Sequence, residues 1–167
     1  MKAVLIITFL LAYNLTAFAQ VPRYDPSGLS EDGRKAYKKI LKAVIFRIGG
    51  VGYSGHTSEE EIALHHLLDD PDSVNALVYL SEHATPEGSL FALLGLRFKI
   101  KEVYEKQIPR VNSLPDPPER ESVEPFRGLT IPAGQVLMQS GCIVDRMKRT
   151  VVLALIESGR YDPDFAK

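Results

Sequence analysis

The side chains best suited to chemistry are concentrated between residues 56 and 83, a stretch that holds all four histidines of the chain. These are His56, His65, His66 and His83. On a helix, Glu61, His65 and Asp69 would share one face because they are four residues apart, and histidine with carboxylate is a ligand set that zinc accepts. The same spacing is also typical of a solvated helix face with local charge pairs. The pattern therefore leaves a metal site and a plain polar surface both open.

Cys142 is the only cysteine and so the only candidate thiol nucleophile. It would need a base from elsewhere in the chain, and His56, His65, His66 and His83 are the candidates. The alternative is a structural cysteine, because Ile143 and Val144 follow it directly and free cysteine in apolar surroundings is commonly buried. With no second cysteine an internal disulfide is excluded, although an intermolecular one stays open. We favour a buried, structural Cys142 over a catalytic one.

Other catalytic and cofactor signatures are missing. Ser140 lacks the Gly-x-Ser-x-Gly context of a hydrolase elbow, and no carboxylate pair stands alone in an apolar setting, as glycosidase chemistry requires. The chain has no dinucleotide fingerprint and no haem-attachment motif, so no cofactor is expected. A formal net charge of −1 gives no basic excess for nucleic-acid binding.

The first residues have the three parts of a signal peptide. Lys2 supplies positive charge, residues 3–11 are mostly apolar, and Ala17-Phe18-Ala19 is a cleavage site. The apolar run is short of the roughly 20 residues that span a bilayer. We therefore predict cleavage after Ala19, no transmembrane segment in the mature chain, and a secreted or periplasmic protein.

Three helix starts follow one another between residues 57 and 106. Thr57-Ser58-Glu59, Asp70-Pro71-Asp72 and Thr85-Pro86-Glu87 each offer a side-chain oxygen to the free N–H groups of a first turn. We expect helices at about 58–68, 71–82 and 86–105. Residues 90–96 are apolar on nearly every side, which indicates a buried central helix. Gly95 within it favours a close approach of another helix.

Paired short helices joined by an Asp-Pro-Asp turn, with an Ala-Leu-x-x-Leu pattern after it, occupy residues 67–80. This arrangement resembles HEAT and armadillo α-helical repeats over residues 57–106. The resemblance implies packing of helix against helix and protein binding on a concave face.

The flanking segments complete the prediction. Residues 20–29 are expected as an extended arm, and residues 30–48 as a helix with an apolar stripe and a basic face, followed by a glycine-rich turn. The basic face holds Lys35, Lys38, Lys39 and Lys42, and fits an anion-binding or membrane-surface patch as well as a solvated face.

Residues 107–132 contain six of the eleven prolines, which predicts an extended segment that wraps the surface. Residues 135–144 favour a strand or hairpin, and residues 146–158 a final helix.

The sequence thus predicts one mainly α domain over residues 30–167. It would be a compact bundle of about five helices, with the proline-rich segment crossing it and a small β element before the last helix. The expected function is that of an exported, non-enzymatic protein that binds another protein through a helical surface. The competing hypothesis is a small cysteine-dependent hydrolase.

Overall fold

The computed structural model describes residues 24–53, 55–123 and 126–162. The predicted signal peptide, residues 1–19, and the first part of the predicted arm, residues 20–23, lie outside the described residues. No described helix is both long and apolar enough to cross a membrane.

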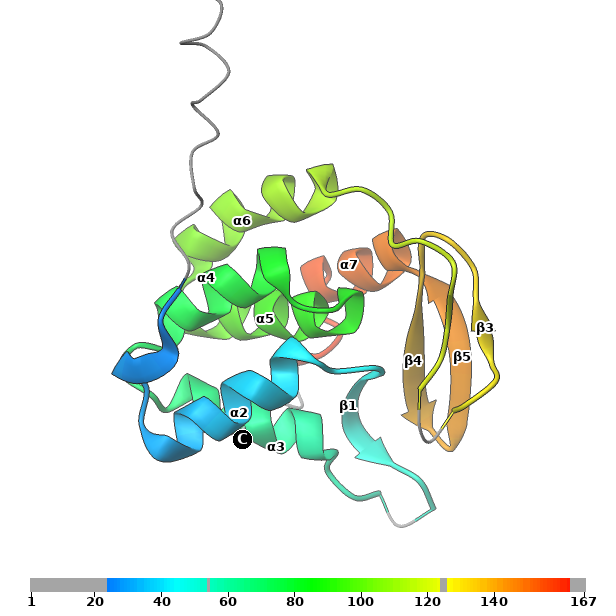
Figure 1. Ribbon diagram of the computed structural model, residues 1–167, viewed down its shortest axis with the longest axis horizontal. Helices are drawn as coiled ribbons and strands as arrows, with labels where there is room; N and C mark the ends of the chain where they lie inside the picture. Colours follow the sequence, from blue (N-terminus) through cyan, green and yellow to red (C-terminus); the bar gives the residue numbers. More distant parts are fainter. Residues whose placement is uncertain (1–23, 54, 124–125, 163–167) are drawn as a thin grey trace, which may run out of the picture.

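The described chain is mainly α with a small amount of β structure, as predicted (Figure 1). A 3-10 helix, η1, precedes six α-helices and five strands. In chain order the elements are η1 (Pro26–Gly28), α2 (Glu31–Leu41), β1 (Phe46–Val51), α3 (Glu59–Leu68), α4 (Ser73–His83), α5 (Pro86–Lys99), α6 (Lys101–Ser113), β2 (Arg120–Glu121), β3 (Thr130–Ile131), β4 (Gln135–Gly141), β5 (Ile143–Lys148) and α7 (Arg149–Glu157).

Helix α5 is the centre of the core, which confirms the prediction for residues 90–96. Leu90, Phe91, Leu93, Leu94 and Leu96 are all fully buried. Helices α2, α3, α4, α6 and α7 all contact α5. Side-chain carbons of Leu64 and Leu77 lie 2.9 and 3.0 Å from the position that a Cβ on Gly95 would take. The absence of a side chain at Gly95 therefore lets α3 and α4 approach α5 closely.

The start of α5 also fixes the end of α2. Thr85 caps α5 by accepting a hydrogen bond from the Gly88 amide at 3.1 Å. The Thr85 hydroxyl donates to the Ala43 carbonyl at 2.5 Å, and the Thr85 amide donates to the Leu41 carbonyl at 3.2 Å. The carbonyl groups of Leu41, the last residue of α2, and of Ala43 are thus satisfied by the start of α5.

The predicted helix over residues 30–48 is wrong in its second half. Helix α2 ends at Leu41, and Phe46–Val51 forms strand β1, where a glycine-rich turn between helices was expected. Val44, Ile45 and Ile48 match helical spacing, but branched and aromatic side chains also favour strands. The pairing of β1 with β4 decides between the two, and β4 is far away in the sequence.

The three-stranded sheet has the order β1-β4-β5, with β1 parallel to β4 and β4 antiparallel to β5. The hairpin β4–β5 confirms the expected β element before the last helix. One face of the sheet, with Phe46 and Val136, joins the helical core. The other face, with Ile45 and Leu137, forms a second small core with Ile131.

The proline-rich segment begins inside a helix, contrary to the prediction. The long helix expected from residue 86 to 105 breaks at Ile100, whose backbone is extended, and α6 then runs to Ser113 with Pro109 inside it. Proline removes one helical hydrogen bond, but α6 continues past it.

Beyond α6 the chain does wrap the surface. Ile131 of β3, with Phe126 and Leu129 before it, packs on the outer face of the main sheet, and β2 pairs with β3. Arg120 of β2 pairs with Glu87 in the first turn of α5, and Glu87 also accepts a hydrogen bond from the Leu137 amide at 2.9 Å. Glu87 is fully buried, so this carboxylate joins the wrapping segment, the central helix and β4.

Candidate functional site

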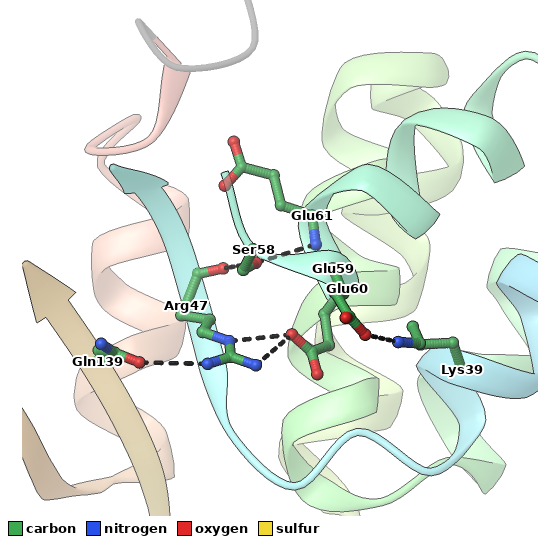
Figure 2. Close-up of polar contacts among 7 residues, drawn as sticks. All are labelled: Lys39, Arg47, Ser58, Glu59, Glu60, Glu61 and Gln139. Carbon is green, nitrogen blue, oxygen red and sulfur yellow. Dashed lines mark hydrogen bonds and ion pairs between the residues drawn. The ribbon is translucent and has the colours of Figure 1, made fainter. Parts of the chain in front are cut away.

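The start of α3 closes the free edge of β1 through two side chains (Figure 2). Ser58 caps α3 by accepting from the Glu61 amide at 3.1 Å, and its hydroxyl donates to the Arg47 carbonyl at 3.2 Å. Oε2 of the buried Glu61 accepts a hydrogen bond from the Gly49 amide at 2.9 Å. Two backbone groups on the edge of β1 that a further strand could use, the Arg47 carbonyl and the Gly49 amide, are therefore already occupied.

Arg47 ties the same helix to the sheet (Figure 2). Its Nε and Nη2 atoms both lie 2.9 Å from Oε2 of Glu60, and Nη1 donates to the Gln139 side chain at 3.3 Å. The Glu60 side chain is only 12% exposed. Two nitrogens of Arg47 thus share one carboxylate oxygen of Glu60, and the pair is partly shielded from water.

Next to this cluster, α2 and α3 enclose a groove with a volume of about 290 Å³. Lys39 near the end of α2 pairs with Glu59 at the start of α3, whereas Asp32 and His66 line the groove from the other ends of the two helices. The helices therefore run antiparallel. The groove is lined by Asp32, Lys35, Ala36, Lys39, Glu59, Ile62, Ala63 and His66; we refer to this set as the α2–α3 groove.

The groove has an apolar floor and a charged rim. Ala36 and Ala63 are buried at the floor, but Ile62 is 44% exposed. On the rim, Lys35 lies 2.9 Å from Glu31 and 3.4 Å from Asp32. The hydrogen bond from Lys39 lowers the pKa of the Glu59 carboxyl below its usual value. Both signs of charge are thus present on the rim of a groove whose exposed apolar residue is Ile62.

The candidate metal ligands do not come together. Glu61 is buried against β1, whereas His65 and Asp69 are exposed on α3. Within the described ranges, no group of three or more histidine, cysteine, aspartate or glutamate side chains is placed to hold a metal ion. The alternative of a plain polar surface does not hold for Glu61 either, because its carboxylate is turned inward to the Gly49 amide.

Cys142 is exposed, and the prediction that it is buried is wrong. It lies in the turn between β4 and β5, after Gly141 with its positive φ of 56°. The register pairs Ser140 with Ile143, so the turn of the hairpin consists of Gly141 and Cys142. In the described part of the chain no hydrogen bond joins Cys142 to a histidine.

All four histidines are exposed, and their places differ. His56 lies in the connection between β1 and α3, and His66 lines the α2–α3 groove. The His83 ring stacks on Tyr79 with 4.0 Å between ring centroids, and its Nδ1 lies 2.9 Å from the Tyr79 carbonyl. His83 thus has a local structural role at the end of α4.

Sequence reasoning missed Arg47, Glu59 and Ile62 as residues of interest. Ile62 carried a usable signal, because it is an apolar residue outside the leucine stripe of its helix. The sequence shows the lysines of the basic face. That Lys39 lies opposite Glu59 depends on how α2 and α3 pack.

No family model matches this chain, and comparison with curated proteins and with solved structures likewise finds no match.

Proposed function

We propose that this chain is an exported, non-enzymatic protein that binds another protein through the α2–α3 groove. The observation that carries the proposal is Ile62, an apolar side chain 44% exposed beside a groove of about 290 Å³. Apolar anchors surrounded by polar residues are typical of the energetic centre of an interface. Charges of both signs on the rim would fix the orientation of the bound protein.

The resemblance of residues 57–106 to HEAT and armadillo repeats includes α3 but not α2; it supports binding through a helical surface in general, because those families bind proteins in this way. The hydrolase alternative has less support. A cysteine hydrolase needs a histidine within hydrogen-bond reach of the thiol, and no described hydrogen bond gives Cys142 such a partner.

The proposal is tested by affinity capture with three forms of the tagged chain: wild type, Ile62→Asp and Val151→Asp. Val151 on α7 is the matched control, because it is a branched apolar residue that is 45% exposed and lies outside the groove. An untagged copy of the chain is present together with the proteins of its own compartment. We expect the partners captured by wild type to be kept by Val151→Asp and lost by Ile62→Asp.

Equal capture by all three forms, or capture of nothing by wild type, contradicts binding through the groove. Circular dichroism of the variants checks that each is folded.

The proposed export rests on residues 1–19 alone. Mass spectrometry of the protein from its natural compartment should show a chain that begins at Gln20. An intact Met1 on that protein would contradict export through a cleaved signal peptide.

A further inference from the structure

The two walls of the α2–α3 groove carry complementary residues at three positions along the direction of the helices, which we call levels. At one end Lys39 of α2 faces Glu59 of α3, and at the other end Asp32 of α2 is level with His66 of α3. Between them the small Ala36 of α2 is level with the protruding Ile62 of α3. Lys39, Ala36 and Asp32 of α2 thus each lie level with a residue of α3 that complements them in charge, in size or in polarity.

We infer that the protein bound in the groove is a second copy of this chain, docked about a two-fold axis that runs along the groove. This inference rests on the proposed function. Rotation about that axis keeps the level of each residue and places α2 of one copy over α3 of the other. Contacts in such an interface occur twice, once from each copy.

The resulting contacts are favourable at all three levels. Lys39 of one copy meets Glu59 of the other, and Asp32 meets the His66 imidazole. Ile62 packs against Ala36, where a small residue leaves room for it. The exposed half of Ile62 would leave water, as expected for the centre of an interface.

Charge complementarity points to a second copy more than to an unrelated protein. The exposed face of α2 carries Lys35, Lys38 and Lys39, with Glu31 and Asp32 exposed in its first turn, and α3 begins with the exposed carboxylate of Glu59. A two-fold axis across the groove would instead place α2 over α2 and α3 over α3, in antiparallel directions. Lys39 would then meet Asp32, but near the axis Lys35 would meet Lys35, a like-charge contact that disfavours association, and Ile62 would meet Ile62. The axis along the groove avoids both of these contacts.

The experiment measures self-association by sedimentation equilibrium of the wild-type chain, of Lys39→Glu and of Glu59→Lys. Wild type should form dimers as its concentration rises. Each variant alone should dimerise roughly tenfold or more weakly, because each places like charges opposite each other twice per dimer. An equimolar mixture of the two variants should dimerise again, because positions 39 and 59 then carry opposite charges at both contacts of the mixed dimer.

The mixture is the decisive arm, since repulsion within each variant chain is the same alone and mixed. Val151→Asp serves as the control and should dimerise like wild type. A wild-type chain that remains monomeric overturns the inference, and so does a mixture that associates no better than its components. If the capture experiment retains other proteins but not the untagged copy, this inference fails while the proposed function stands; if it retains nothing, both fail.

Discussion

Ile40 and Gly88 meet backbone to backbone where α2 ends on the first turn of α5. The carbonyl oxygen of Ile40 lies so close to Gly88 that a Cβ on Gly88 would overlap with it. The contact fixes the direction of α2, and with it one wall of the α2–α3 groove.

Substitution of Gly88 by alanine should therefore destabilise the protein strongly. Because a backbone oxygen cannot rotate away, the helices must separate, and we expect a loss of about 1–3 kcal/mol or more. The control is Gly52→Ala, where no atom lies within 4 Å and the cost comes only from the positive φ of 71°. Urea denaturation of both variants provides the comparison; a smaller loss for Gly88→Ala than for Gly52→Ala would mean that α2 can move freely on α5.

Phe91→Ala should remove the central ring of the core. Phe91 is fully buried and its centroid lies 4.9 Å from that of Phe46 on β1. Truncation of such a ring costs about 3–5 kcal/mol, out of a total of about 5–15 kcal/mol for a domain of this kind. Thermal denaturation should show a much lower melting temperature, whereas Tyr53→Ala, at a fully exposed aromatic, should melt like wild type. Similar melting of Phe91→Ala and Tyr53→Ala would contradict a central role for α5.

Glu87 should make the free energy of unfolding depend on pH. Burial raises the pKa of this carboxyl above its usual 4.5, although Arg120 and the Leu137 amide oppose the shift. The folded protein therefore holds the proton more tightly than the unfolded chain does. The stabilisation is complete below about pH 4.5 and declines as pH rises through the folded pKa.

The measurement is the free energy of unfolding of wild type and Glu87→Gln across that interval. The difference between the two isolates Glu87, because all other groups titrate in both proteins. Stability of wild type should fall relative to Glu87→Gln as pH rises from 4.5. A difference that moves the other way would show that the pairing with Arg120 outweighs the cost of burial.

Cys142 should react rapidly with a thiol reagent in the native protein, because its side chain is exposed in the β4–β5 turn. Reaction with Ellman's reagent should be nearly as fast in buffer as in denaturant. Cys142→Ser should change the free energy of unfolding by less than about 0.5 kcal/mol, as for most exposed positions. Slow labelling that becomes fast only in denaturant would contradict the exposed position.

Helix caps and buried turns could be predicted from the sequence where a local pattern determines them. Thr85 caps its helix as expected, and Ser58 caps α3 one residue after the expected Thr57, because a cap needs only its own first turn. The all-apolar turn around Phe91 could only be buried. Asp70 shows the limit of such reasoning: it does not cap α4 but accepts a hydrogen bond from the Ser30 amide at 2.9 Å.

The features missed from the sequence all depend on distant partners. Strand β1 exists because Phe46 pairs with Met138, and Glu61 is buried because it meets Gly49. Ile62 could be recognised as an exposed apolar residue only after α2 and α3 were placed side by side. The α2–α3 groove has no counterpart in a motif, so its residues are visible only in three dimensions.

The parallel pairing of β1 with β4 has a consequence for the order of folding. All of α3, α4, α5 and α6 lies between the two strands, so β1 cannot acquire its partner until that whole segment has been gathered into place. Closing so large a loop is slow compared with contacts between neighbouring helices. In a refolding experiment followed by pulsed hydrogen exchange, amides of α4 and α5 should become protected early. Amides of β1 should become protected last, when the two distant strands meet in one sheet.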